Sequence, residues 1–324
     1  MLASLLSFME SGSQGGSCLF AIPLARRTQV SHRSSRRRML VDYATTFGFI
    51  VPSLLGFVVF YLVPLVRGLC LSFTDWDLLG PAHFVGLANY YELLKDDQFW
   101  NSVLVTFEYV LWNIPIQTVI AMGLALIMRR LKSSSLLKGA FIVPWFLPNV
   151  VVALLALVIL DPAIGILNEG IKALGFRPLG FLTTTQLAMP AIACVNTWKF
   201  MGYTALVLFA GLQAIPCEVD EAALIDGAEG WTAFFKITLP LLRPVLAFVL
   251  VTSVIGSFQV YDTVAVTTRG GPVNSTWVMN FFIFKNAFEE YRMGYSTAAA
   301  MFLFALLAGA GFAQVRLMRA GKAD

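Results

Sequence analysis

Three side chains within the apolar segment 187–211 have the chemistry to bind a polar solute. Asn196, Lys199 and Tyr203 lie at positions i, i+3 and i+7, a spacing that places an amide, an ammonium group and a phenol along one face of a helix. All three groups form hydrogen bonds with hydroxyls. An ionisable group such as Lys199 is costly in apolar surroundings, which makes it a candidate functional residue.

Further polar side chains recur at helical spacing in two other apolar segments. They carry hydroxyl or amide groups: Ser253, Ser257 and Tyr261 in segment 245–265, and Asn113 and Gln117 in segment 103–128. With the first three they could line a path for a hydroxyl-rich solute. An alternative stays open, in which these groups hold helices together by hydrogen bonds and Lys199 extends its ammonium group to an interface.

A different kind of site is indicated between the apolar segments, in the loop 212–243. Pro216 suits the start of a helix, and acidic residues follow in its first turn, where the helix dipole favours them. Ala222 and Ala223 have small side chains that another protein could approach closely, and Gly227 permits the turn that ends the helix. Apolar residues at helical spacing then continue until Pro240 and Pro244, which we expect to stop them. The pattern predicts a helix-turn-helix, which either docks on a partner or packs on its own bundle.

The elements that must position these residues are membrane-spanning helices. The chain has 324 residues, of which 58% are hydrophobic and 13% charged, with a mean hydropathy of +0.75; charged residues make up about a quarter of a soluble domain. Segments of about 20 apolar residues can span a bilayer, and six meet this length: 44–66, 103–128, 140–160, 187–211, 245–265 and 296–316. The sequence predicts an all-α integral membrane protein with six transmembrane helices.

The positions of Lys and Arg predict the orientation of these helices. Basic residues concentrate in 26–38, 129–138, 236–243 and 316–322, and short cytoplasmic segments hold an excess of such residues. We therefore expect both termini and the loop 212–243 to be cytoplasmic. The net charge of +4 follows from these flanks, so no nucleic-acid partner is expected.

The chain divides into a tail and a membrane domain. Residues 1–40 are rich in Ser, Gly and Arg, which is typical of a disordered segment. The basic cluster follows the weakly apolar stretch 18–25, the reverse of a secretory leader, so no cleaved signal peptide is expected. Residues 41–320 form the predicted transmembrane domain.

The sequence offers no catalytic, metal or cofactor site. The four cysteines stand at unrelated spacings and the two histidines lie outside the six segments, so neither a metal site nor a membrane-embedded enzyme is predicted. A phosphate-binding loop of the form GxxxxGK[ST] is also missing from the sequence. ATP must therefore be hydrolysed elsewhere if it drives this protein.

The loop 212–243 resembles the signature of binding-protein-dependent ABC importer permeases, which reads EAA, three residues, G, nine residues, I, one residue, LP. The matching positions are Glu221, Ala222, Ala223, Gly227, Ile237, Leu239 and Pro240. SFTDWD at 72–77, FVGLANY at 84–90 and GGPVNST at 270–276 are similar to carbohydrate-uptake permeases of the maltose, glycerol-3-phosphate and multiple-sugar type, first-permease group.

The resemblance implies a permease subunit of a bacterial cytoplasmic membrane that moves a sugar or sugar-like solute by alternating access. It implies three kinds of partner in addition to the lipid bilayer: a second homologous permease, two ATP-binding subunits that hold ATP and Mg, and an extracytoplasmic solute-binding protein. The signature residues, with Asp226 among them, would contact the ATPase. An ion-coupled secondary transporter is the alternative.

Overall fold

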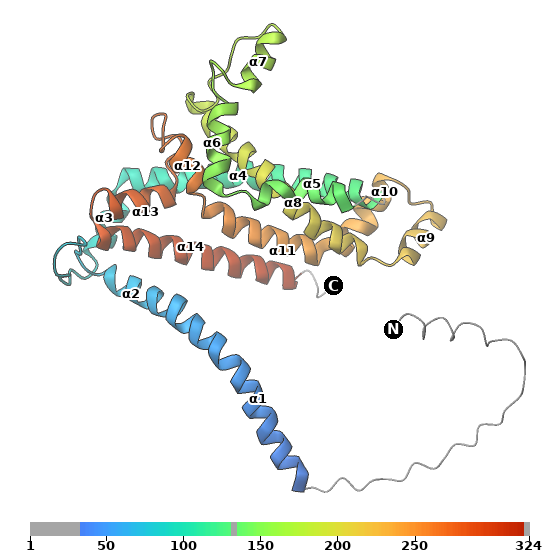
Figure 1. Ribbon diagram of the computed structural model, residues 1–324, viewed down its shortest axis with the longest axis horizontal. Helices are drawn as coiled ribbons and strands as arrows, with labels where there is room; N and C mark the ends of the chain where they lie inside the picture. Colours follow the sequence, from blue (N-terminus) through green and yellow to red (C-terminus); the bar gives the residue numbers. More distant parts are fainter. Residues whose placement is uncertain (1–32, 131–134, 321–324) are drawn as a thin grey trace, which may run out of the picture. The chain divides into compact units, whose positions relative to one another are not determined.

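The computed structural model describes residues 33–130 and 135–320. The expected tail, residues 1–40, lies mostly outside the described residues. Residues 33–40 of it begin helix α1. Because arginine is a good helix former, the first spanning helix extends beyond its apolar part. The regular elements of the described ranges are helices (Figure 1), and their bounds are α1 (Arg33–Phe57), η1 (Val58–Leu62), α2 (Val63–Leu71), α3 (Ala88–Lys95), α4 (Asp97–Arg130), α5 (Ser135–Phe146), α6 (Asn149–Ile159), α7 (Ile166–Ala173), α8 (Thr185–Gln213), α9 (Cys217–Ile225), α10 (Trp231–Ala233), η2 (Phe234–Thr238), α11 (Leu239–Phe258), α12 (Asp262–Thr267), α13 (Met279–Phe288) and α14 (Met293–Ala320).

The predicted membrane spans are confirmed, with one of them broken. Among the described residues, five helices are long and apolar enough to cross a bilayer: Thr45–Leu71, Asp97–Arg129, Thr185–Gln213, Trp231–Thr267 and Met293–Gln314. The remaining predicted span, 140–160, consists of two helices, Lys138–Phe146 and Asn149–Ile159, bent by 99°. Pro148 precedes the second helix with φ −57° and ψ 142°, and a proline cannot donate the hydrogen bond that would continue the first.

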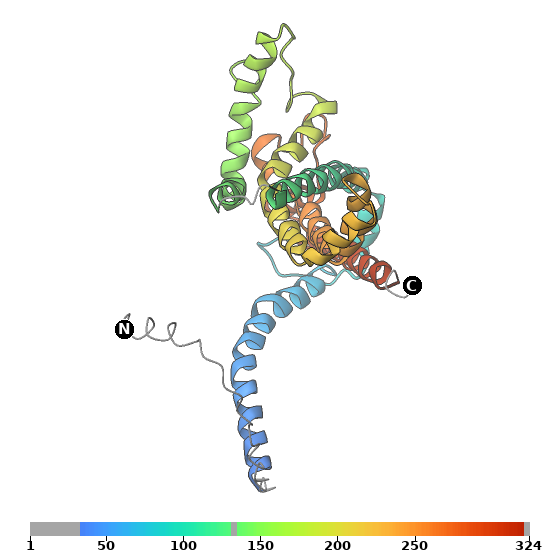
Figure 2. The same ribbon diagram turned by 90° about the vertical axis from the view of Figure 1, so that its right-hand side faces the viewer.

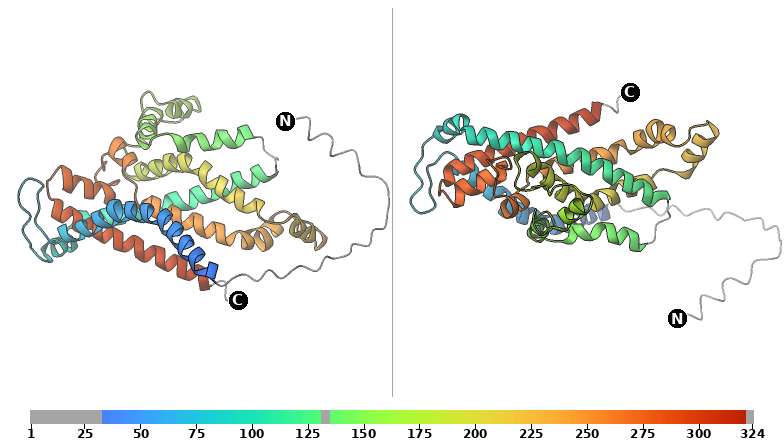
Figure 3. Two further views of the ribbon diagram at one scale, coloured as in Figure 1. Left: turned by 60° about the horizontal axis from the view of Figure 1, so that its bottom comes forward. Right: turned by 90° about the horizontal axis from the view of Figure 1, so that it is seen from above.

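The chain forms two compact units, residues 1–62 and 63–324. In the first, none of the described side chains of 45–62 is buried, as suits an apolar helix surrounded by lipid or by another chain. In the second, α4 packs along α8, and α5 and α11 also pack on α8. These helices run alongside α14 (Figure 3). In contrast, α6 and α7 project away from the bundle (Figure 2).

The buried residues of α4, α8 and α11 in the second unit form successive apolar and polar groups along these helices. One apolar cluster contains Phe99 and Val103 of α4 with Met189 and Ile192 of α8. A second contains the later parts of the same helices, including Ala125 and Leu208, and Leu242 of α11. The buried Asn113, Gln117, Asn196 and Thr204 fall between these clusters in the sequence of their helices. The bundle therefore has a polar layer between two apolar ends.

A close backbone approach holds the broken span against this bundle. Gly202 is buried in α8, and a Cβ atom there would collide with the carbonyl oxygen of Phe141 in α5. Because that neighbour is backbone, it cannot rotate away as a side chain would. Small residues allow such contact between membrane helices.

We expect Gly202→Ala to destabilise the protein by about 1–3 kcal/mol, because the added methyl group forces α5 and α8 apart. Gly309→Ala is the matched control, since a Cβ atom there meets nothing within 4 Å. The measurement is thermal unfolding of both variants in detergent. Equal midpoints would show that the close approach is unimportant.

Candidate functional site

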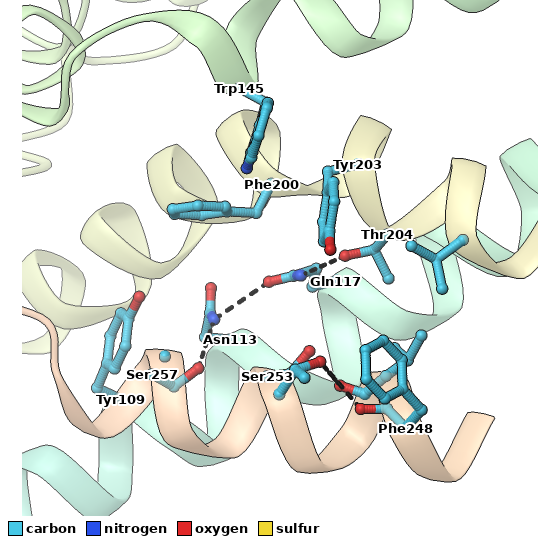
Figure 4. Close-up of a pocket in the computed structure, with 14 residues that line it drawn as sticks. Tyr109, Asn113, Gln117, Trp145, Phe200, Tyr203, Thr204, Phe248, Ser253 and Ser257 are labelled. Atoms are coloured by element: carbon cyan, nitrogen blue, oxygen red, sulfur yellow. Dashed lines mark hydrogen bonds between the residues drawn. The ribbon is translucent and has the colours of Figure 1, made fainter. Parts of the chain in front are cut away.

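A cavity of about 280 Å³ lies in the polar layer (Figure 4). The lining includes five of the eight side chains that we proposed from the sequence: Asn113, Gln117, Tyr203, Ser253 and Ser257. The other lining residues are Tyr109, Trp145, Phe200, Thr204, Val207, Phe248, Val249, Thr252 and Gly256. These residues all lie in the described ranges, and none of them carries a formal charge. The volume is close to the lower limit of small-molecule pockets.

Two amides in the cavity wall also connect helices. Asn113 donates hydrogen bonds to Gln117 Oε1 (3.3 Å) and to Ser257 Oγ (3.0 Å). Gln117 donates to Thr204 Oγ1 (2.8 Å), which links α4 to α8. The alternative that we left open therefore holds in part for these residues: they join helices and still line the cavity.

Two aromatic rings form one wall of the cavity. Trp145 of α5 and Tyr203 of α8 are stacked, with ring centroids 5.1 Å apart and planes inclined by 12°. Their position beside Gly202 follows from the close approach of the two helices. Trp145 could not be found from the sequence, because helical spacing within one segment does not show which side chains of another segment lie against it.

Asn196, Lys199 and Tyr261 do not line the cavity. Asn196 donates to the Tyr109 hydroxyl (2.8 Å) and accepts from Thr263 Oγ1 (2.9 Å). The Tyr261 ring packs against Phe284, with centroids 5.0 Å apart. Asn196 and Tyr203 share a helix face as expected, but seven residues separate them by about 10 Å along the axis. Of the two, only Tyr203 lines the cavity.

Lys199 bonds to residues outside the cavity. Its ammonium group donates to Asn149 Oδ1, and Asn149 Nδ2 donates in turn to Asp262 Oδ2 (2.6 Å). The side chain of Lys199 is buried, with the residue only 4% exposed. This cation is therefore matched by a carboxylate of its own chain.

The loop 212–243 contains the helix and turn that its sequence predicts. Gly227 has φ +74°, a conformation that favours glycine. The Ala228 N–H bonds to Ala223 O (2.8 Å) and the Gly227 N–H to Leu224 O (3.1 Å), which is the Schellman arrangement that ends a helix. The turn after α9 is thus built by backbone hydrogen bonds around one glycine.

Helix α9 presents an apolar surface flanked by acidic residues. Glu221, Ala222, Leu224 and Asp226 are exposed, and Ile225 is 87% exposed. Ala223 differs from its neighbour because it is only 5% exposed. It lines a second cavity, of about 930 Å³, between the end of α4 and this loop.

The expected stop at Pro240 and Pro244 was wrong, because both residues lie within α11. Helical structure continues from Trp231 through η2 into α11, with Ile237 in the π-helical turn η2 and Leu239 and Pro240 at the start of α11. A proline is tolerated in the first turn of a helix because its missing N–H would have no partner there. Trp231 remains 75% exposed. The loop is therefore joined to α11 by an almost continuous helix.

The fold and the site together define an α-helical membrane protein with an uncharged polar cavity and an exposed helix, α9, that ends in a glycine turn. Residues 117–320 match the family described as binding-protein-dependent transport system inner membrane component. The chain is 34% identical over 247 residues to the trehalose/maltose transport system permease protein MalF of Thermococcus litoralis, which covers 76% of this chain and 82% of the relative. It is 32% identical over 285 residues to the probable ABC transporter permease protein YesP of Bacillus subtilis, with 85% and 89% covered.

A solved structure shares the fold. A chain of a bacterial ABC transporter involved in the import of the acidic polysaccharide alginate superposes with a TM-score of 0.74 at 22% identity, and 89% of this chain and 98% of that chain are covered. The protein therefore belongs to the family of binding-protein-dependent transport inner membrane components. It is a multi-pass permease of the ABC importer class, as the resemblance implied. The ion-coupled alternative has no support from these relatives.

We expect Asn196→Leu to lower the free energy of unfolding by about 1–3 kcal/mol, because it leaves the Tyr109 and Thr263 hydroxyls without their shared amide; such bonds contribute about 0.6–2 kcal/mol each in membranes. Gln213→Leu, which removes an exposed amide at the end of the same helix, is the control. Thermal unfolding in detergent measures both. The hydrogen bonds would be dispensable if Asn196→Leu unfolded at the wild-type temperature.

Proposed function

We propose that this chain carries an uncharged sugar or sugar-like solute across the bacterial cytoplasmic membrane by alternating access. The observation that carries the proposal is the cavity, whose wall combines amides, hydroxyls and a stacked aromatic pair without a formal charge. The trehalose/maltose relative supports this substrate class, as does the similarity to an arabinooligosaccharides transport permease of Bacillus subtilis, at 29% identity over 268 residues.

The wall of the cavity suits a neutral solute better than an acidic one. Sugar hydroxyls can exchange hydrogen bonds with amides and hydroxyls, each worth a net of about 0.5–1.5 kcal/mol, and the Trp145–Tyr203 pair offers an apolar surface to a sugar ring. A carboxylate would meet no cation in this wall, and an unpaired charge in low-dielectric surroundings is costly. Lys199 cannot serve, because it does not line the cavity and its ammonium group already donates to Asn149, which in turn bonds to Asp262.

The assembly that follows from this function contains a second homologous permease, two ATP-binding subunits and an extracytoplasmic solute-binding protein. ATP and Mg would be held by the ATPase partners. The excess of Lys and Arg beside the loop 212–243 and near both ends of the chain supports a cytoplasmic position for the loop and for both termini. Residues 41–320 would form the permease domain.

The loop is well built to connect an ATPase to the cavity. The exposed Leu224 and Ile225 between Glu221 and Asp226 provide an apolar contact with acidic neighbours, and Ala222 leaves room for a close approach. Ala223 and Gly227 fix the helix on its own chain and form its turn. Since η2 runs into α11, which supplies Phe248, Ser253 and Ser257 to the cavity, Ile237, Leu239 and Pro240 would transmit a movement of the loop to the cavity wall.

Transport itself is tested with the complete assembly in proteoliposomes. We expect uptake of a labelled neutral oligosaccharide that requires ATP and the solute-binding protein. A charged oligosaccharide of equal length, presented with the same binding protein, should be carried poorly. Uptake driven by an ion gradient without ATP would refute the proposal.

We expect Tyr203→Ala to raise the KM for uptake about fivefold, equivalent to about 1 kcal/mol, because the solute loses one ring of the stacked pair. Tyr203→Phe keeps the ring and should stay close to wild type. Tyr91→Ala, an exposed tyrosine of α3 outside the cavity, is the control. Concentration-dependent uptake measures all three, and an unchanged KM in Tyr203→Ala would remove this wall from the solute path.

We expect Glu221→Lys, Gly227→Pro and Ile225→Glu to leave the chain inserted but uncoupled, with solute-stimulated ATP hydrolysis reduced at least tenfold. The first reverses a charge, the second removes the glycine turn, and the third places a charge at the most exposed apolar position of α9. Ile225→Leu is the matched control. Stimulated ATPase activity that survives all three changes would show that the loop is not the coupling element.

A further inference from the structure

Three polar side chains beside the cavity connect three helices. Lys199 of α8 donates to Asn149, the first residue of α6, and Asn149 donates to Asp262, the first residue of α12. The buried Lys199 forms the inner end of the cluster, and Asn149 forms its exposed edge. Helix α12 packs on α6 and on α8, so the bonds lie where the three elements meet.

Asn149 and Asp262 each directly follow a break in a membrane span. Asn149 follows the 99° bend between α5 and α6, at which α6 turns away from the bundle (Figure 1). Asp262 follows the interruption after Phe258, where Tyr261 has the non-helical angles φ −145° and ψ −60°. Helix α8, which carries Lys199, runs from Thr185 to Gln213 without interruption. One unbroken helix is therefore tied to both breaks.

The chemistry of the bridge is specific to an amide. Its oxygen accepts from the lysine and its nitrogen donates to the aspartate, so neither a leucine nor a carboxylate at position 149 could serve both neighbours. The positive and negative charges compensate each other through Asn149, and removal of either leaves the other uncompensated in low-dielectric surroundings. The next residue, Thr263, adds a neutral bond from α12 to Asn196 of α8 (2.9 Å).

The breaks are the places where the two spans can change direction, because they lack continuous helical hydrogen bonds. The cavity lies directly beside them: α5 contributes Trp145 just before the first break, and α11 contributes Ser257 just before the second. A contact that fixes the angles of both breaks therefore also fixes the positions of two walls of the cavity.

We propose that Lys199, Asn149 and Asp262 are positioning residues for transport, which lock the two breaks in the conformation of this structure. The proposal rests on the transport function proposed above. The lock stabilises one conformation of the permease over others, so weakening it shifts the population towards conformations that ATP-driven closure normally has to produce. These residues act on the cavity wall and not on the solute.

The test compares Lys199→Met, Asp262→Asn and the double variant Lys199→Met/Asp262→Asn in the complete assembly. Each single change should lower the thermal midpoint, and the double variant should recover more than half of the loss because no charge is left unpaired. Both single variants should raise ATP hydrolysis without solute at least threefold and reduce the maximal uptake rate, while the KM for a neutral sugar changes less than twofold. Lys172→Met, which removes the exposed Lys172–Glu169 pair, is the control and should match wild type.

Two results would overturn the proposal. A KM that rises in Lys199→Met but not in Asp262→Asn would make Lys199 a solute-binding group. The bridge would be structural only if the double variant recovered its thermal midpoint while both single variants kept wild-type uptake. Their ATP hydrolysis without solute would also have to equal that of the wild type. The thermal comparison does not depend on uptake, so a wild-type assembly that fails to carry sugar would count against the proposed function and not against the bridge.

Discussion

The structure depends on one constraint, that polar groups buried in a membrane bundle must find their hydrogen-bond partners within the protein. In α4, α8 and α11 these groups gather in one layer, and apolar clusters occupy the helices on both sides of it. Asn113 and Gln117 satisfy each other and also bond to α11 and α8. Because amides have more donors and acceptors than these bonds use, the same layer can both hold the helices and offer hydrogen bonds to a solute. The cavity is found at this level and its wall is uncharged.

Much of the fold could be predicted from the sequence because it depends on local properties. Apolar segments of sufficient length identified the spans, and Gly227 identified the turn that ends α9. Pro144 and Pro148 favour a bend in the span, but they do not give its angle of 99°, because the direction of α6 is set by its packing on α12 and α8. Pro240 was misread as a stop since the π-helical turn that precedes it leaves no trace in the apolar pattern.

The candidate site could be predicted only where one helix was sufficient. Helical spacing found Asn113, Gln117, Tyr203, Ser253 and Ser257, all of which line the cavity. It could not find Trp145, whose role depends on the close approach of α5 to Gly202. Nor could it show that Lys199 has a carboxylate as its counter-charge, because Asp262 lies in a different span and is reached through Asn149. Contacts between distant segments decide which polar residue faces the solute and which faces another helix.

The separation of charge from the cavity has a consequence for transport. A permease must release its solute as readily as it accepts it, so a wall that binds through several weak, exchangeable hydrogen bonds is better suited than one that holds a solute by a buried charge. Lys199 and Asp262, which are connected through Asn149, place the charges of this region between helices and not in the cavity wall. There these charges act on the conformation of the protein and not on the solute. Weak contacts to the solute and a hydrogen-bonded connection at the breaks are thus compatible with a cycle in which ATP hydrolysis by the partners, and not solute affinity, determines when the path opens.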